Sequence, residues 1–249
     1  MNILNKILDA KRHEIEYIKN VKIKKNKPRN LQKALSSSGI SVIAEIKMKS
    51  PSEGNIFYNA DPVQIAKDYE SAGADAISVL TDGKFFGGSL EILCAVRDAV
   101  SIPVLRKDFI IDEKQIYQSA NADAFLLIAE AVNHDKLQKL LIAGKSAGLE
   151  SLVEFHDEEN AEFIFVLNPE IVGVNCRNLE TMAIDISYFE KMFSSLPSDS
   201  IKVAESGIST SADLKYVSNL GYDAALIGTS LMKTGNPGKA LEGMLKGLS

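Results

Sequence analysis

The sequence predicts an α/β fold, a (β/α)8 TIM barrel with an extra N-terminal helix. From residue 41 onward, eight short apolar runs alternate with longer helical patterns. After an N-terminal extension of about 40 residues, roughly 26 residues remain for each of eight units, which suits one strand, one helix and two loops. The predicted strands are 41–47, 75–81, 103–109, 123–130, 150–155, 170–176, 201–206 and 223–229.

The residues before the first strand, 1–40, are expected to form a helical extension. Apolar side chains recur there at helical spacing and predict an amphipathic helix over 3–18. These side chains are Ile3, Ile7, Leu8, Ile15 and Ile18. The basic stretch 22–29 that follows is interpreted as a solvated connector, with a flap near an anionic ligand as the alternative.

The helices between the strands carry their own start and stop signals. Asp61 and Pro62 are typical of a helix start, and Gly73 ends the helix predicted over 61–73. Gly148 likewise ends the helix predicted after residue 133. Three helix-to-strand junctions, AGADAISVL, SANADAFLLI and LGYDAALIG, each enter a strand through an Asp-Ala pair. This repetition indicates a series of βα units.

An open doubly wound sheet is the main rival fold. Such sheets usually have fewer strands, and no GxGxxG motif follows the first predicted strand. No linker or shift in composition appears after residue 41, so we expect one domain over 1–249.

Composition excludes several classes of protein. The 249-residue chain has a formal net charge of −5, whereas a nucleic-acid-binding protein needs a basic surface. Its hydrophobic content of 45% is too high for a disordered chain. No apolar stretch approaches the ~18 residues of a membrane span, and the N-terminus lacks the pattern of a secretory signal. With only two cysteines, a disulfide framework is not expected, and we expect a reducing, cytoplasmic location.

Polar side chains stand at the carboxyl ends of five predicted strands. They are Glu45, Lys47, Lys107, Glu154, Asn175 and Glu205. Barrel active sites lie at this end, and a charge inside an apolar run is costly unless it is paired or used. A salt bridge would explain any one of them, but the group as a whole predicts a clustered active site. Two lysines and three glutamates suffice for acid–base catalysis.

Glycine-containing loops follow the last two predicted strands, where barrels often bind phosphate through backbone N–H groups. Gly207, Gly228 and Thr229 are the expected donors. Ser50 can add a hydroxyl from the first loop, and Arg177 can contact the ligand by charge. Each loop alone is a weak signal, but together they predict a phosphorylated small-molecule ligand.

Other reactive side chains are not expected to take part. The three histidines lack the spacing of metal ligands, so no metal site is predicted. Cys94 is expected in the core, and Cys176 is expected to point away from the site. The pair Phe85 and Phe86 can be packing or a wall of the pocket, and both interpretations stay open.

Around these residues the sequence resembles the indole-3-glycerol-phosphate synthases of tryptophan biosynthesis. The block IAEIKMKSPSEG at 43–54 is highly specific for that family. Further matching blocks are VLRKDFIID (104–112), LVEFH (152–156), VGVNCRNLET (172–181), VAESGI (203–208) and LIGTSLM (226–232). The resemblance covers essentially the whole chain and is to the monofunctional form.

The resemblance implies a carboxy-lyase reaction that needs no metal or organic cofactor. Ring closure, decarboxylation and dehydration of 1-(2-carboxyphenylamino)-1-deoxyribulose 5-phosphate would give indole-3-glycerol phosphate. By motif position, Lys107 is similar to the family's general acid for ring closure, and Glu154 to its acid/base glutamate. Lys47 matches the lysine that assists dehydration, and Glu45 a glutamate that orients these groups. The other matches, to substrate-contacting, orienting or phosphate-binding residues, are Asn175, Glu205, Arg177, Ser206, Ser50, Gly207, Gly228 and Thr229.

Three positions depart from the family pattern. Cys176 stands where a small polar residue is common, Asn178 where aspartate is common, and Glu53 where lysine or glycine is frequent. Losing the aspartate is expected to loosen a link to Arg177. None of the three is a proposed proton-transfer residue, so affinity is expected to suffer more than activity.

Two alternatives stay open. One is a neighbouring phosphate-binding barrel enzyme, such as phosphoribosylanthranilate isomerase or the tryptophan synthase α subunit. Such an isomerase would carry a cysteine on the first strand, where this chain has Glu45 and Lys47. The other is a non-catalytic barrel that binds a phosphorylated ligand, which would not need Lys107 or Glu154. The expected partners are the small-molecule substrate and, weakly, other tryptophan-pathway enzymes. No nucleic acid or membrane is expected to bind, and the expected state is a monomer.

Overall fold

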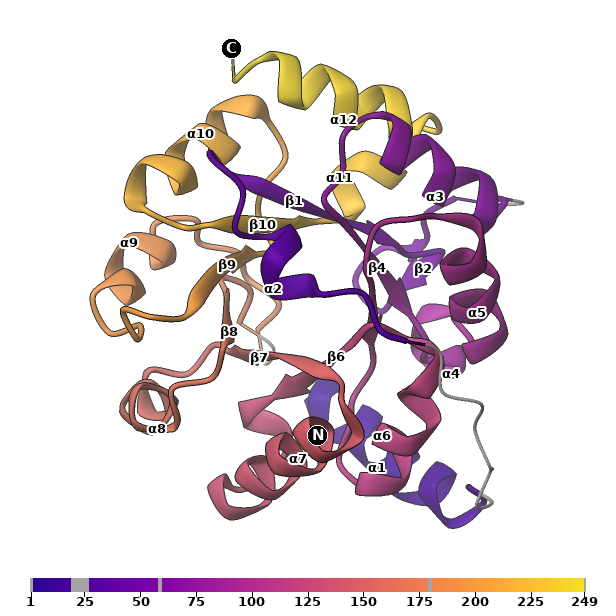
Figure 1. Ribbon diagram of the computed structural model, residues 1–249, viewed down its shortest axis with the longest axis vertical. Helices are drawn as coiled ribbons and strands as arrows, with labels where there is room; N and C mark the ends of the chain where they lie inside the picture. Colours follow the sequence, from indigo (N-terminus) through magenta and orange to yellow (C-terminus); the bar gives the residue numbers. More distant parts are fainter. Residues whose placement is uncertain (1, 19–26, 58–59, 179–180, 249) are drawn as a thin grey trace.

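The computed structural model describes residues 2–18, 27–57, 60–178 and 181–248. Eight parallel strands close into a barrel with helices packed around it (Figure 1). They are β1 (Ser41–Ile46), β4 (Ala76–Leu80), β5 (Val104–Lys107), β6 (Ala124–Ile128), β7 (Glu150–Phe155), β8 (Ile171–Asn175), β9 (Ile201–Glu205) and β10 (Ala224–Ile227). Neighbours follow chain order, and β10 pairs with β1 to close the ring. Each strand lies within its predicted segment, so the prediction of a (β/α)8 barrel is confirmed.

The helices of the outer layer begin and end on local signals. They are α3 (Pro62–Ser71), α5 (Leu90–Ala99), α6 (Glu113–Gln118), α7 (His134–Ala147), α8 (Ala161–Leu167), α9 (Tyr188–Phe193), α10 (Ser211–Leu220) and α12 (Pro237–Lys246). The Asp61 side chain caps α3, and Pro62 occupies its first turn, as predicted. Gly148 adopts a left-handed conformation that ends α7.

Shorter elements lie in the connecting loops. They are the helices α4 (Gly83–Phe86) and α11 (Thr229–Met232), the hairpin of β2 (Lys49–Ser50) and β3 (Gly54–Asn55), and the 3-10 turns Ser119–Asn121, Ala129–Ala131 and Glu158–Asn160. No helix in the described ranges combines the length and apolar character that crossing a membrane requires.

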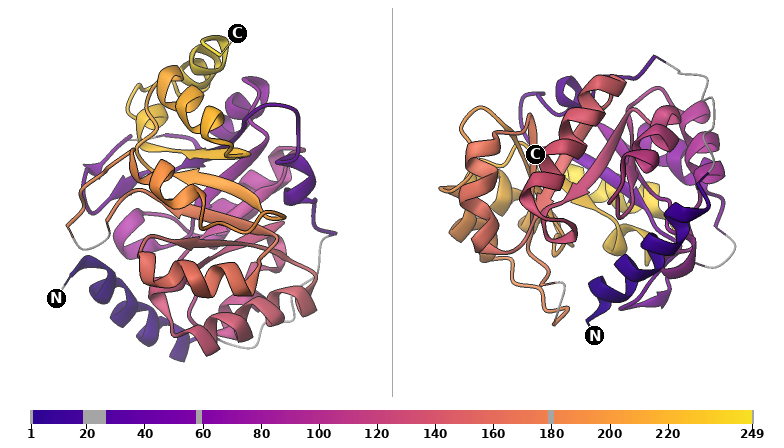
Figure 2. Two further views of the ribbon diagram at one scale, coloured as in Figure 1. Left: turned by 90° about the vertical axis from the view of Figure 1, so that its left-hand side faces the viewer. Right: turned by 90° about the horizontal axis from the view of Figure 1, so that it is seen from below.

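Within the described residues before the barrel, the chain forms α1 (Ile3–Glu16) and α2 (Leu31–Ala34), and they lie at opposite ends of the barrel (Figure 2). The backbone N–H groups of Leu31 and Gln32 in α2 donate to the Glu150 carboxylate at the start of β7. The helix predicted over 3–18 is present as α1, which ends at Glu16. Most of the basic stretch, residues 22–26, lies outside the described residues.

Strand alternation divides the buried side chains into two apolar clusters. Val42 and Ala44 of β1 face the surrounding helices, whereas Ile43 faces the barrel interior. Glu45 is two residues further on, and it is also buried on the interior side. The same alternation turns the predicted site residues of the other strands inward.

The two cysteines differ in burial: Cys94 lies in α5, and Cys176 directly follows β8. Cys176, directly after β8, is buried in the outer cluster, as predicted. Cys94 is only partly buried, so the prediction that it belongs to the core is wrong. It lies at the margin of the buried face of α5, which is formed by Leu93, Val96 and Arg97.

Candidate active site

A cavity of about 450 Å³ opens at the carboxyl ends of the barrel strands. Strand ends, the loops after them and α1 line it. The predicted site residues that line it are Glu45, Lys47, Ser50, Lys107, Glu154, Asn175, Arg177, Ser206, Gly207, Gly228 and Thr229. Glu205 is buried at the end of β9, where its carboxylate contacts Lys107. The structure therefore brings all twelve predicted positions together, although their roles stay predictions.

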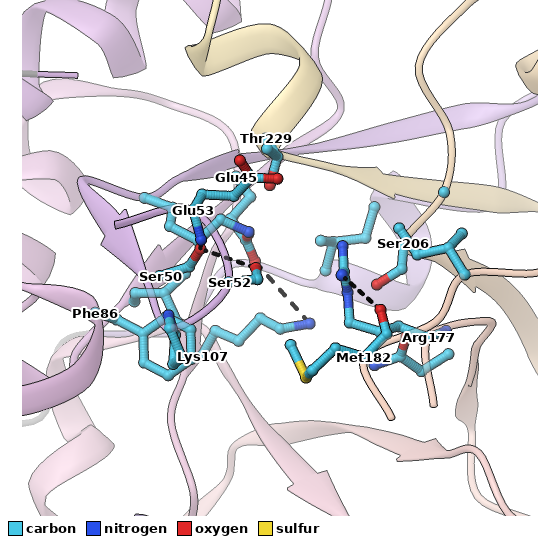
Figure 3. Close-up of a pocket in the computed structure, with 18 of the residues that line it drawn as sticks. Glu45, Ser50, Ser52, Glu53, Phe86, Lys107, Arg177, Met182, Ser206 and Thr229 are labelled. Carbon is cyan, nitrogen blue, oxygen red and sulfur yellow. Dashed lines mark hydrogen bonds and ion pairs between the residues drawn. The ribbon is translucent and has the colours of Figure 1, made fainter. Parts of the chain in front are cut away.

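Lys107 reaches into the middle of this cavity from the end of β5. In Figure 3, Ser50 and Glu53 lie on one side of it and Arg177 on the other. Its Nζ lies 2.5 Å from Glu205 Oε2, 3.2 Å from Glu154 Oε2 and 4.0 Å from Glu45 Oε2.

These carboxylates decide the charge of the Lys107 side chain. Burial favours the neutral amine and would lower its pKa. The negative charges of Glu154, Glu205 and Glu45 outweigh burial and raise the pKa of Lys107 above its ordinary value. The cavity therefore holds an amine that is protonated at neutral pH and can donate a proton to a group placed directly against it.

Glu154 at the end of β7 and Glu205 at the end of β9 lie on either side of β8, and their pKa values are shifted in opposite directions. Burial tends to raise the pKa of Glu154, but the charge of Lys107 and hydrogen bonds from Glu205 and Asn175 lower it. Burial and the nearby Glu154 carboxylate raise the pKa of Glu205 well above its ordinary value. Like charges this close cannot both ionise easily. Glu154 is therefore the member of the pair that ionises more readily, and Glu205 is the one that holds a proton to higher pH.

Two glycines leave room for these carboxyl groups. A Cβ atom on Gly173 of β8 would lie 2.1 Å from Glu205 Oε1. A Cβ atom on Gly228, after β10, would lie 2.6 Å from Glu45 Oε1. Side chains at either position would displace a glutamate of the cluster.

Further contacts orient side chains at the ends of β1 and β8. Lys47 Nζ lies 2.8 Å from Glu45 Oε1, as expected for two residues on one face of β1. Asn175 Nδ2 donates to Glu154 Oε1 at 2.8 Å, and Asn175 Oδ1 accepts from the Arg177 N–H at 3.0 Å. The amide of Asn175 thus fixes the direction of the Glu154 carboxylate.

Backbone N–H groups gather at the side of the cavity formed by the last two strands. Gly228 precedes α11, and Thr229 begins it, so the first N–H groups of this helix have no partner within it. Ser206 and Gly207 after β9 adopt left-handed conformations, with φ values of 69° and 73°. Ser50 accepts a hydrogen bond from the Glu53 N–H and lies in the same cavity. This arrangement can bind an anion such as a phosphate group.

The three departures from the family pattern lie around the cavity rim or behind it. Glu53 forms an ion pair with Lys233, 2.7 Å apart. The Asn178 side chain accepts from the Thr181 N–H within its own loop, and Arg177 Nη1 donates to the Met182 carbonyl at 3.4 Å. Burial raises the pKa of Cys176 to about 12, so this thiol is not a nucleophile at neutral pH.

Several lining residues escaped the sequence-based prediction. Lys233 lies one turn beyond the LIGTS segment, and a search for charged residues in the first turn after a phosphate loop would have found it. Ile3 and Ile7 of α1 also line the cavity. The amphipathic pattern predicted their burial but held no information on which surface they cover.

Comparison with known proteins gives one consistent result. A family model described as indole-3-glycerol phosphate synthase matches residues 4–244. The indole-3-glycerol phosphate synthase of Bacillus velezensis is 42% identical over 247 residues, which are 97% of this chain and 99% of the relative. That of Bacillus licheniformis is 44% identical over 244 residues, 96% and 97% of the two chains. That of Mycolicibacterium gilvum is 45% identical over 216 residues, 86% of this chain and 79% of the relative.

Proposed function

The chain belongs to the indole-3-glycerol phosphate synthase family, and on that premise we propose that it forms indole-3-glycerol phosphate in tryptophan biosynthesis. The substrate would be 1-(2-carboxyphenylamino)-1-deoxyribulose 5-phosphate, and the enzyme a carboxy-lyase. The observation that carries the proposal is the position of Lys107, an ammonium group among three glutamate side chains within one cavity. A ring closure that begins at a carbonyl needs such a proton donor.

Two kinds of lining residue suit the two ends of this substrate. The N–H groups around Gly207, Gly228 and Thr229 would bind the phosphate, with Ser50 adding a hydroxyl. Apolar side chains, with Phe86 of α4 among them, also line the cavity and would accept the aromatic ring. This orientation leaves the reacting carbons near Lys107.

Ring closure is proposed to begin with Lys107. The ring carbon that bears the carboxylate attacks the ribulose carbonyl carbon, and Lys107 donates a proton to the carbonyl oxygen, which becomes a hydroxyl group. The carboxylate then leaves as CO2, and its bonding electrons restore the aromatic ring. Glu205, whose pKa is raised and whose Oε2 lies 2.5 Å from Lys107 Nζ, is placed to return that proton.

Dehydration is proposed to use the other lysine. Lys47 protonates the departing hydroxyl, which leaves as water. The anionic Glu154 removes a proton from the adjacent carbon, and the indole double bond forms. Glu45, 2.8 Å from Lys47 Nζ, orients that lysine. No step requires a metal or organic cofactor, and in the described residues no cluster of three or more His, Cys, Asp or Glu side chains is arranged to hold a metal ion.

Product formation tests the proposal directly. The chain has no tryptophan, so indole emission would rise over a background of tyrosine alone. We expect one CO2 released for each indole formed when the purified protein is mixed with the substrate. An isomerase of the same pathway would release no CO2. A barrel that only binds the phosphorylated ligand would be protected against heat by the substrate without turnover.

Location and assembly are part of the same proposal. We propose that the enzyme acts in the cytoplasm as a monomer, and that contacts with other tryptophan-pathway enzymes are weak. Analytical ultracentrifugation at micromolar concentration tests the monomer, for which a single species near 27.1 kDa is expected. A species of twice that mass would contradict it.

A further inference from the structure

Lys11 of α1 is a buried charge that the proposed chemistry does not use. Its side chain is 2% exposed, and its Nζ lies 2.9 Å from Asp82 Oδ2 and 2.9 Å from Asp108 Oδ1. Glu14, at the solvent edge, lies at the same distance. A lysine this buried is costly to keep charged unless its partners are well placed. Two of these partners are themselves almost completely buried, so the network joins α1 firmly to the barrel.

Asp108 connects this network to the end of β5. It directly follows Lys107, and its Oδ1 also accepts a hydrogen bond from the Phe109 N–H at 2.8 Å. Its Oδ2 accepts from Thr81 Oγ1 at 2.6 Å and from Arg106 Nη2 at 2.9 Å. The Thr81 N–H in turn donates to the Lys107 carbonyl at 3.0 Å. Asp108 therefore fixes the backbone where the chain leaves the cavity floor.

Asp82 connects the network to a second wall of the cavity. Its Oδ1 accepts hydrogen bonds from the N–H groups of Phe85 and Phe86, and this contact caps α4. Phe86 and Phe109 both line the cavity, with ring centroids 5.9 Å apart. Lys11 thus pairs with both carboxylates, and each carboxylate accepts a hydrogen bond from the backbone N–H of one of these two phenylalanines.

We propose that Lys11 is a positioning residue that sets the aromatic wall formed by Phe86 and Phe109, acting through Asp82 and Asp108. Ile7, one helical turn before Lys11, lines the same cavity, so the ion pairs also seat α1 against it. Neither Lys11 nor Asp82 lines the cavity, so an effect of either on substrate affinity must be indirect. This inference rests on the proposed function, because it names the substrate whose ring the wall receives.

Steady-state kinetics of Lys11→Met test the proposal. Methionine keeps an unbranched chain but removes the charge. Lys6→Met, an exposed lysine of the same helix, is the matched control. Measurements are made at a temperature where circular dichroism shows each variant folded. We expect KM to rise about tenfold, as for the loss of charged hydrogen bonds that hold a binding wall. We expect kcat to change less than about threefold, because Glu205 and Glu154 still hold Lys107.

Two further variants separate positioning from stability. Lys11→Arg restores the charge and should recover most of the KM. Asp82→Asn keeps an oxygen acceptor to cap α4 but removes the charge facing Lys11, so KM should rise here as well. This variant is decisive if Lys11→Met does not fold. A merely structural role would lower the melting temperature and leave KM unchanged in folded protein, and that result overturns the proposal.

An unreactive ligand separates this inference from the proposed function. The alcohol obtained by reducing the substrate carbonyl cannot cyclise, yet it keeps the ring and the phosphate. If the parent protein binds this alcohol but does not turn over the substrate itself, the proposed function fails on its own. The positioning role of Lys11 then stands if the alcohol raises the melting temperature of Lys11→Met less than that of the parent and of Lys6→Met. Equal increases for all three proteins refute it.

Discussion

At the scale of single residues, the raised pKa of Glu205 is the property that most distinguishes this site from an ordinary ion-pair cluster. Glu205 is 1% exposed and lies beside both Lys107 and the anionic Glu154. With Glu205 protonated, the two lysines and the two remaining glutamates balance in charge. The buried cluster can then exist without a net charge, which would be costly there.

Glu205→Gln should therefore make stability less dependent on pH. The raised pKa of Glu205 in the folded state favours its neutral form there. The contribution of Glu205 to the parent's stability is therefore fully present below its unfolded pKa near 4.5, and it is lost as pH rises toward the folded value, by at most about 1.4 kcal/mol per pH unit. Glutamine cannot ionise, so the melting temperature of the variant relative to the parent should increase above pH 4.5. A difference that stays constant between pH 4.5 and 8 would contradict this assignment.

The placement of site residues could be predicted where strand periodicity determines the direction of a side chain. Glu45, Lys107 and Glu154 each stand on the inward side of an apolar run, and the closed barrel brings them within ion-pair distance. Lys11 was missed, although it lies four residues from both Ile7 and Ile15 on the buried stripe of its helix. A charge inside such a stripe signals a buried partner, but Asp82 and Asp108 are too distant in sequence for the pattern to name them.

At the scale of elements, β8 is shaped by a glycine. Strand interiors usually avoid glycine, which lacks a side chain to pack. Gly173 is nevertheless required inside β8, because any Cβ atom would overlap the Glu205 carboxyl group on the neighbouring β9. This pairing explains how two adjacent strands can present large polar side chains to a narrow barrel interior.

Gly173→Ala should damage both stability and turnover. The overlap at 2.1 Å forces Glu205 away from Lys107, at an overpacking cost of about 1–3 kcal/mol. Urea unfolding and kcat measured on the folded protein check the two effects. Gly243→Ala is the matched control, because its Cβ would meet nothing within 4 Å on α12. We expect that control to be stabilised by up to about 1 kcal/mol with normal kcat. Normal kcat in Gly173→Ala would show that Glu205 does not act on Lys107.

Element boundaries followed from sequence wherever a cap or a glycine marked them. Asp61, Pro62 and Gly148 delimit α3 and α7 as predicted. The hairpin of β2 and β3 and the four-residue helices α4 and α11 were not predicted, because elements this short contain too few residues for a period to appear. These unpredicted elements carry Ser50, Phe86 and Thr229 into the cavity.

At the scale of the whole molecule, the two ends of the barrel carry separate charge networks. The site occupies the carboxyl end. At the amino end, Asp123 is completely buried and accepts hydrogen bonds from the side chain of Arg97 and the N–H groups of Arg29 and Val104. Arg29 lies in the segment that leads to α2, so Asp123 anchors the N-terminal extension to the barrel away from the site.

Asp123→Asn should therefore lower stability and leave catalysis intact. Breaking a buried ion pair by removing one partner costs about 3–5 kcal/mol. The free energy of unfolding should fall by about that amount, whereas kcat and KM should match those of the parent at temperatures where the variant is folded. Asp199→Asn, an exposed aspartate, serves as the control and should change neither property. A specific loss of kcat in folded Asp123→Asn would show that the two ends are coupled.

The global fold was predictable because eight units repeat, whereas the packing of the N-terminal extension was not. The pattern of a strand followed by a helix recurs about every 26 residues, so eight copies of it support the same assignment. The contacts of α1 with Asp82 and Asp108, and those of α2 with Glu150, occur once each and join residues 71 to 119 positions apart. Such single long-range contacts leave no period in the sequence.

The most direct test of the account is a single-turnover experiment with Lys107→Ala. The variant, in excess over the anilino-deoxyribulose phosphate, is mixed with it, and indole emission is followed against the parent protein. We predict that the parent forms indole in one phase. The folded variant should still be protected against heat by the substrate but should form indole at least about 100-fold more slowly, as expected for loss of a positioned acid. Near-normal indole formation by Lys107→Ala would contradict the assignment of Lys107 as the proton donor.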